Sequence, residues 1–347
     1  MPRVIGIDPG TVSLDVCGLA DGRVDVDLTF PTAEALADPQ RFIAMLTEHG
    51  RPDLVAGPSG YGLPLTRAAD ASEADLRLAF LAGPDEGGGI GGLRRFARQL
   101  GASGLPVFYT PGVIHLDTVP AYRKLNRVDM GTADKVAVAA LAIEQHRERT
   151  GRPLEAISLI VLELGGAFTA GLAVHRGQIV DGVGGTSGPI GWQAAGALDG
   201  EVAYLAGPID KAVLFQGGVE TVARSGPGGR LIAIEAYLEG AAKAVHLLRS
   251  SAPAADEVLV SGRAAADADL VERLGGMLTG VATVRPLAGF AVAAKQGAQG
   301  AAIIADGLAG GRCAPLVQHL RIRQASGSVL DHLHVISPEA ARRRLAG

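Results

Sequence analysis

The sequence predicts an α/β protein of two domains, each built on a β-meander, which is a run of three strands joined by short turns. A chain of 347 residues is long enough for about two domains of about 150 residues. Hydrophobic residues make up 48% and charged residues 20% of the chain, so a sizeable core can be buried. The meander pattern occurs twice at a fixed spacing, and helical segments follow each copy.

The first meander opens the chain. An apolar run over residues 4–7 ends at Asp8 and is followed by the turn residues Pro9 and Gly10. A second run over residues 12–20 leads to Asp21 and Gly22, and a third covers residues 23–28. Apolar runs of this length, separated by Pro-Gly and Asp-Gly, are typical of strands joined by tight turns.

The second meander covers residues 159–183 and repeats the first. Its acid and turn glycines stand 155 residues after those of the first copy. Glu163 corresponds to Asp8, Gly165 to Gly10 and Gly177 to Gly22. A shared register of acid, glycine and glycine over about twenty residues indicates duplicated halves.

The first turn of each meander predicts a phosphate site. A carboxylate at the end of a strand, followed at once by glycine, allows backbone N–H groups to approach an anion closely. We expect the two turns to hold a polyphosphate between them, with its magnesium bound mostly through water. The alternative for either copy alone is an ordinary hairpin. The predicted phosphate-binding residues are Gly10, Thr11, Gly165 and Gly166, and the predicted metal-binding acids are Asp8 and Glu163.

A mixed charge cluster precedes a helix predicted over residues 133–147, for which Thr132 and Asp134 are good first residues. The cluster is either a solvated face or a substrate site. In the second case an arginine fork suits a phosphoryl group, and Arg123 is the first choice for it. If the acceptor is a carboxylate, Arg123 and Arg127 would bind that carboxylate instead. The remaining members of the cluster are Lys124, Asp129 and Lys135.

Other segments carry weaker expectations. Residues 32–49 predict a helix with Thr32 as N-cap, and residues 230–249 and 291–307 predict two more. The glycine loop at residues 87–92 is an anion site, a lid or a spacer, and the loop at residues 182–191 either covers the acceptor or is a surface loop. The basic stretch that ends the chain predicts a solvated tail.

Composition excludes several classes of function. A net charge of −4 and an aromatic content of 4% argue against nucleic-acid binding. The sequence has no run of about 18 apolar residues, so no membrane helix is predicted. An acid as early as Asp8 argues against a signal peptide. Cys17 and Cys313 are too few and too isolated for a zinc site or a disulfide framework. The cytoplasm is therefore the expected compartment.

Three motifs of the sequence resemble those of the acetate and sugar kinase, Hsc70 and actin superfamily. The two acid-glycine turns resemble its two phosphate motifs, and residues 258–263, Val-Leu-Val-Ser-Gly-Arg, resemble its adenosine motif. The resemblance implies a two-domain actin-like ATPase fold of ribonuclease H type, with ATP and Mg2+ in the cleft between the domains. It implies an N-terminal lobe at residues 1–150, a nucleotide-binding lobe at 151–311 and an extension at 312–347. Gly262 and Arg263 would then contact the nucleotide.

Further segments resemble an uncharacterised family labelled as predicted butyrate kinases. They are residues 58–62, 111–116, 122–127 and 129–135, and this resemblance extends to about residue 311. One departure concerns the first turn: acetate and butyrate kinases usually have an asparagine there and a lysine further along the hairpin, whereas this chain has Asp8 and Asp15. In sugar kinases of similar fold, an aspartate at the start of a helix like the one predicted over residues 133–147 is the general base. Here that aspartate is Asp134, with Asp129 the second choice.

The predicted function is ATP-dependent phosphoryl transfer to a small carboxylate or hydroxyl compound. The alternative is a nucleotide-dependent switch that acts on a protein partner, and a third reading is a binding protein without catalysis. The predicted partners are a nucleotide and a small-molecule acceptor, without nucleic acid or membrane, and a homodimer is left open.

Overall fold

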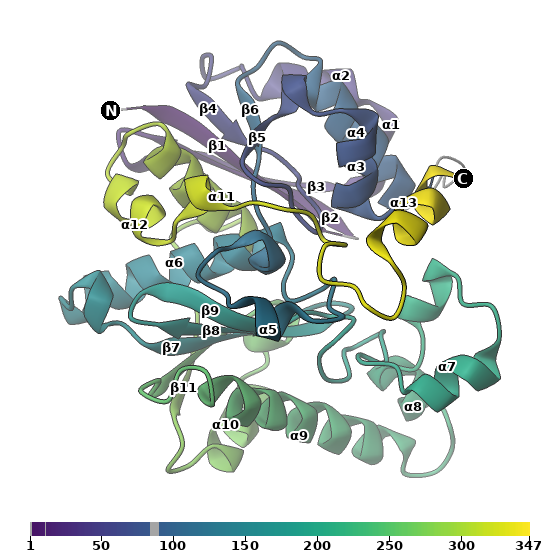
Figure 1. Ribbon diagram of the computed structural model, residues 1–347. Helices are drawn as coiled ribbons and strands as arrows, with labels where there is room; N and C mark the ends of the chain where they lie inside the picture. The colour runs from purple at the N-terminus through teal and green to yellow at the C-terminus, as the bar shows by residue number, and fades with distance from the viewer. Residues whose placement is uncertain (1, 11, 84–89) are drawn as a thin grey trace. The chain divides into compact units, whose positions relative to one another are not determined.

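The computed structural model describes residues 2–10, 12–83 and 90–347, and the chain divides into two compact units (Figure 1). The first unit comprises Met1–Val128, Thr132–Leu154 and Gly289–Gly347. The second comprises Asp129–Gly131 and Glu155–Ala288. Each unit has one β-sheet, which confirms the α/β class.

The first unit is built on a six-stranded sheet in the order β3-β2-β1-β4-β6-β5. The first three strands are antiparallel neighbours, whereas β1, β4 and β6 run parallel and β5 is antiparallel to β6. The strand bounds are β1 (Arg3–Pro9), β2 (Ser13–Ala20), β3 (Arg23–Pro31), β4 (Leu54–Ala56), β5 (Thr66–Arg67) and β6 (Val107–Tyr109).

Helices cover both faces of this sheet. On one face, Ile5 packs in a core with Phe42 and Phe96, whose rings meet edge to face at 5.2 Å. On the other face, a Cβ at Gly6 would overlap the backbone at Ala298 and Ala302, so only glycine allows this close approach. The helices of the unit are α1 (Thr32–Ala37), α2 (Pro39–Met45), α3 (Glu73–Phe80), α4 (Ile90–Gly101), α5 (Ala121–Lys124), α6 (Ala133–Thr150), α11 (Gln296–Leu308), α12 (Ala314–His319) and α13 (Pro338–Ala346).

The second unit has a five-stranded sheet in the order β11-β10-β7-β8-β9. Strands β7, β8 and β9 form the antiparallel meander, and β10 runs parallel to both β7 and β11. Its core joins Leu162 of β7 to Tyr237 and Leu274 of the covering helices. The elements are β7 (Leu159–Leu164), β8 (Thr169–His175), β9 (Gln178–Val183), α7 (Gly200–Ala206), α8 (Val219–Ala223), α9 (Gly229–Arg249), β10 (Glu257–Ser261), α10 (Ala268–Met277) and β11 (Thr283–Pro286).

The two meanders share one strand register, which confirms the duplication. Asp8 pairs with Asp15 across the first hairpin, and Glu163 pairs with Ala170 at the equivalent place in the second. The pairing shifts at Gly18/Leu19 in the first copy and at Ala173/Val174 in the second, again 155 residues apart. The second turns also match, because Asp21 and Gly22 have φ of 51° and 74°, and Arg176 and Gly177 have 51° and 75°. Positive φ at both central residues is typical of the I′ turns that suit hairpins.

The predicted helix over residues 32–49 is divided in two. Its break falls at Asp38, because Pro39 starts α2 and the Asp38 carboxylate accepts a hydrogen bond from the backbone N–H of Arg41. Thr32 is the first helical residue rather than the N-cap, and its hydroxyl donates to the carbonyl oxygen of Gly10 at 2.7 Å.

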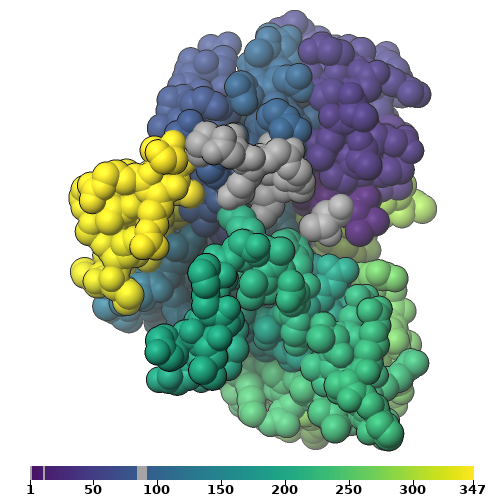
Figure 2. Space-filling view, turned by 90° about the vertical axis from the view of Figure 1, so that its right-hand side faces the viewer, coloured from purple at the N-terminus to yellow at the C-terminus, as the bar shows by residue number. Residues whose placement is uncertain are grey.

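The C-terminal residues form structure where the sequence predicted a solvated tail. They include α12 and α13, and Figure 2 shows the last residues of the chain as a compact yellow mass. Arg342 of the basic stretch donates to Ser328 at 3.2 Å and to Asp331 at 3.0 Å, so its charge is used within the chain. By their contacts, residues 289–347 belong to the first unit, including residues 289–311 that the predicted division assigns to the nucleotide-binding lobe.

Candidate functional site

The turn between β1 and β2, a predicted phosphate site, is closed by a backbone hydrogen bond. The backbone N–H of Gly10 donates to the carbonyl oxygen of Ser13 at 2.9 Å. A Cβ at Gly10 would lie 2.7 Å from that same oxygen, so the turn requires glycine. Thr11, a predicted phosphate-binding residue, lies outside the described residues, as does most of the glycine loop at residues 87–92.

The turn between β7 and β8 repeats this arrangement. The N–H of Gly165 donates to the carbonyl oxygen of Phe168 at 3.0 Å, and a Cβ at Gly165 would lie 2.8 Å from that oxygen. Gly166 has open space where a side chain would stand. Two turns with equivalent bonds and equivalent glycines occupy equivalent places in the two units.

The structure brings the second turn together with the predicted adenosine motif. Gly262 has φ of +87°, and a Cβ there would lie 2.6 Å from the carbonyl oxygen of Leu164. Glu163 stands opposite Ser261 in the parallel register of β7 and β10. Arg263, by contrast, has an exposed side chain at the start of a short 3-10 helix. The backbone at Gly262 therefore adjoins the turn at Gly165, as a nucleotide site in this unit requires.

Asp8 lies at the N-terminal end of α11. Its carboxylate occupies the place that a side chain at Gly297 would take. Mg2+ is commonly held by one or two carboxylates together with substrate phosphates and water, so a single half-buried acid beside a phosphate turn fits this ion. The described residues contain no group of three or more His, Cys, Asp or Glu side chains arranged to hold a metal.

The positive charges of the predicted substrate cluster have different surroundings. Lys124 is buried, with its ammonium donating to the carbonyl oxygen of Leu116 at 2.8 Å, and burial lowers the pKa of Lys124. Arg123 lies 5.6 Å from the centre of the Tyr122 ring, and Arg127 is exposed. The bond to Leu116 fits a structural role for Lys124. Arg123 and Arg127 remain the predicted anion-binding pair.

Asp134 starts α6 in close contact with two neighbours. Thr132 donates a hydrogen bond to one carboxylate oxygen and the ammonium of Lys135 contacts the other. Burial alone would raise the pKa of Asp134, but the charge of Lys135 and these hydrogen bonds outweigh it and hold the pKa below its usual 3.8. Asp134 is therefore ionised at neutral pH and is a weak base.

Asp129 holds the glycine loop at residues 182–191. Its carboxylate accepts hydrogen bonds from the N–H and the hydroxyl of Thr186, both at 3.1 Å, and from the N–H of Gly131. Its backbone oxygen accepts from the Ser187 hydroxyl at 2.5 Å. These bonds favour a positioning role for Asp129 over that of second-choice general base.

Lys295 is a residue of the site that sequence reasoning missed. It is the N-cap residue of α11, and its ammonium donates to the Ser13 hydroxyl and lies 3.3 Å from the Asp15 carboxylate on β2. The first hairpin itself has Asp15 and no lysine, and a cation reaches it from 282 residues further along the chain. No signal in the sequence links positions so far apart, because only the fold brings α11 to β1 and β2.

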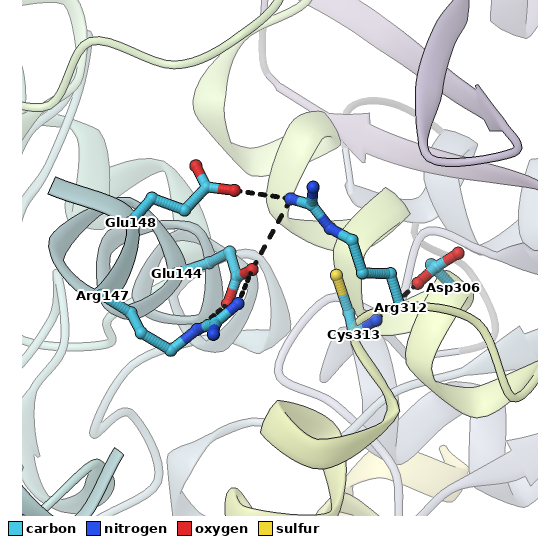
Figure 3. Close-up of polar contacts among 6 residues, drawn as sticks. All are labelled: Glu144, Arg147, Glu148, Asp306, Arg312 and Cys313. Carbon is cyan, nitrogen blue, oxygen red and sulfur yellow. Dashed lines mark hydrogen bonds and ion pairs between the residues drawn. The ribbon is translucent and has the colours of Figure 1, made fainter. Parts of the chain in front are cut away.

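The first unit also has a cavity of about 200 Å³. None of the predicted site residues lines it. Arg312 bridges its wall to α6, because its guanidinium lies 2.5 Å from Glu148 and 3.7 Å from Glu144 (Figure 3). Glu144 also pairs with Arg147 at 2.6 Å. These ion pairs join α6 to the start of α12 and fit a structural role.

The fold places the chain in a class of proteins. Solved structures that it resembles include a propionate kinase from Francisella tularensis, with a TM-score of 0.60, 13% identity and coverage of 87% of this chain and 98% of that one. An acetate kinase from Entamoeba histolytica matches with a TM-score of 0.57 and 11% identity, over 80% of this chain and 87% of that one. An acetate kinase from Porphyromonas gingivalis matches with a TM-score of 0.56 and 12% identity, over 87% of this chain and 98% of that one. The chain thus has the fold of acetate and propionate kinases, which confirms the predicted actin-like fold.

Within that class, the chain belongs to a family of proteins of unknown function, DUF1464, whose model matches residues 6–335. No curated protein matches the sequence. Among the described helices, none is both long enough and apolar enough to cross a membrane.

Proposed function

We propose that the protein is an ATP- and Mg2+-dependent kinase that transfers the γ-phosphoryl group to a small-molecule acceptor. The observation that carries this proposal is the pair of equivalent hairpin turns, each with a carboxylate two residues before its first glycine. Phosphoryl transfer depends mostly on positioning and charge neutralisation, which turns of backbone N–H groups and a bound Mg2+ supply. The fold shared with acetate and propionate kinases supports it.

We favour a short carboxylate as the acceptor, in line with the butyrate kinase-like resemblance. The pairing of Asp134 with Lys135 keeps Asp134 a weak base, and a carboxylate acceptor needs no base to remove a proton. Arg123 and Arg127 would then bind the carboxylate. A hydroxyl acceptor would instead require Asp134 as general base.

The test is a thermal-shift screen of MgATP with short carboxylates, polyols and sugars, followed by a phosphotransfer assay of the compounds that stabilise the protein. We expect butyrate or a similar acid to raise the melting temperature with nucleotide and to be phosphorylated. Stabilisation and turnover with sugars alone would overturn the carboxylate assignment and leave the kinase assignment standing.

The Asp8→Ala variant tests the magnesium assignment. Asp8 stands beside the first turn and the end of α11, so its loss should weaken nucleotide binding only when Mg2+ is present. Calorimetric titrations with ATP, in Mg2+ and in a chelator, measure the difference. Equal Mg2+-dependent binding by the variant and the unaltered protein would contradict the role of Asp8.

A nucleotide-driven switch is the second candidate, and exposed apolar side chains in the second unit favour it. Tyr204 and Leu205 are 81% and 79% exposed at the end of α7, and Leu231 is 73% exposed on α9. Such side chains suit contact with a protein partner. A switch would hydrolyse ATP without any acceptor, whereas the kinase requires one, so ATP turnover with and without acceptor separates the two.

A further inference from the structure

The Lys295 ammonium lies beside the first phosphate turn. Its nitrogen would be 3.6 Å from a Cβ on Gly10, and it contacts Ser13 and Asp15 on the strand that leaves the turn. Asp8 lies at the same end of α11, against Gly297. A cation, a metal-binding acid and a glycine turn are therefore neighbours within one unit.

The segment before Lys295 is held in place by two side chains. The Asp27 carboxylate accepts hydrogen bonds of 2.7–3.1 Å from the backbone N–H groups of residues 292–294. The Gln299 side chain, which is 2% exposed, accepts from the N–H groups of Phe290 and Ala291 at 2.6 and 3.2 Å. The position of Lys295 is thus fixed before any ligand binds, which lowers the entropy lost on binding.

Asp15 and Ser13 orient the ammonium from one side. Asp15 is 1% exposed and accepts a 2.8 Å hydrogen bond from the Ser13 hydroxyl. Its second oxygen has no hydrogen-bond partner in the described part of the chain. A buried carboxylate is costly unless paired, so Asp15 has a strong electrostatic reason to keep Lys295 here. The lysine side chain is 52% exposed and has three donors, which leaves it a donor for a ligand.

We propose that Lys295 binds a terminal phosphoryl oxygen of the nucleotide at the first turn. This inference rests on the proposed function and names one more residue of its site. Two acids, Asp8 and Asp15, accompany Lys295 here, so we expect the site to take the magnesium complex of the nucleotide rather than the free anion. Asp15 is a positioning residue, because it acts through Lys295.

The experiment compares nucleotide affinities by calorimetry on the full chain, without acceptor, for Lys295→Met and Lys295→Arg. The control is Lys243→Met, which removes an exposed lysine paired only within α9 in the described structure. We expect Lys295→Met to weaken MgATP binding at least about tenfold, as for a lost charge-assisted hydrogen bond, and to change AMP binding less than about threefold. Lys295→Arg and the control should bind MgATP within about threefold of the unaltered protein.

Equal MgATP affinity in Lys295→Met and the unaltered protein would overturn the inference and leave the proposed function intact. An equal loss of MgATP and AMP binding would overturn it as well, because the loss would not depend on the terminal phosphates. Failure of the unaltered protein to bind any nucleotide would remove the proposed function itself. Should the methionine variant not fold, Lys295→Gln keeps a polar side chain and gives the same comparison.

Discussion

At one position in each of the two turns, the backbone geometry requires glycine. At Gly10 and Gly165 the space for a Cβ is taken by the carbonyl oxygen that accepts the turn hydrogen bond, at 2.7 and 2.8 Å. Any other residue would force the turn apart, which is why the same glycine appears in both copies. Side-chain roles are less regular, because Lys124 and Lys135 belong to one charge cluster in the sequence and yet contact different groups.

At the same scale, Asp134→Asn tests the general base. If the acceptor is a hydroxyl compound, we expect phosphotransfer to fall at least about a hundredfold while nucleotide affinity changes little. The Lys135 ammonium and the Thr132 hydroxyl hold the pKa of Asp134 below its ordinary value, so activity should persist to more acidic pH than it would with an unpaired aspartate. Steady-state kinetics of the unaltered protein and the variant over a pH series from neutral into acid measure both effects, and unchanged turnover in the variant would remove Asp134 from this role.

His115 predicts a pH dependence of stability. It is 2% exposed, and burial lowers its pKa from 6.5 to about 4; the Gly112 backbone opposes this shift and the charge of Lys124 adds to it. The unfolded chain then binds more protons than the folded one between these values, so stability falls as pH drops from about 6.5 to 4. The loss should reach about 3 kcal/mol at pH 4.

Denaturation of the unaltered protein and of His115→Leu at several pH values measures this loss of stability. The variant should lose less stability between pH 6.5 and 4, because the leucine does not titrate. Parallel pH curves for the two proteins would contradict the buried neutral histidine.

Helices and strands of the first unit meet through small residues. A Cβ at Gly300 would overlap the backbone oxygen of Ala137, so α11 and α6 touch backbone to backbone. Gly297 and Gly300 stand three residues apart, a spacing at which small residues permit close helix contact, and Gly300 makes such a contact with α6. What the sequence did not provide was the partner, because the match between α11 and α6 depends on residues far apart in the chain.

Gly300→Ala should therefore destabilise the protein by about 1–3 kcal/mol or more, as overpacking does. The matched control is Gly276→Ala in α10, where a Cβ meets nothing within 4 Å. Alanine there should be neutral or stabilise by up to about 1 kcal/mol, because glycine is a poor helix former. Melting temperatures of both variants give the comparison, and equal shifts would contradict the account of this contact.

For the whole molecule, the sequence predicted the fold class and the duplication because both leave local signals, namely acids and glycines in one register. In the structure the predicted residue Gly262 adjoins the turn residue Gly165. Lys295, the loop-holding role of Asp129 and the ordered C-terminal helices could not be predicted, because each depends on contacts between distant segments. Local patterns identify turns, whereas the fold decides which side chains reach them.

The central claim is that both acid-glycine turns bind nucleotide phosphates. Hydrogen exchange of the backbone amides, measured by mass spectrometry on peptides covering residues 8–14 and 163–169, tests it most directly. With MgATP, we predict slower exchange in both peptides, and no slowing when a chelator removes the magnesium. Slower exchange in only one peptide, or in neither, would contradict the claim.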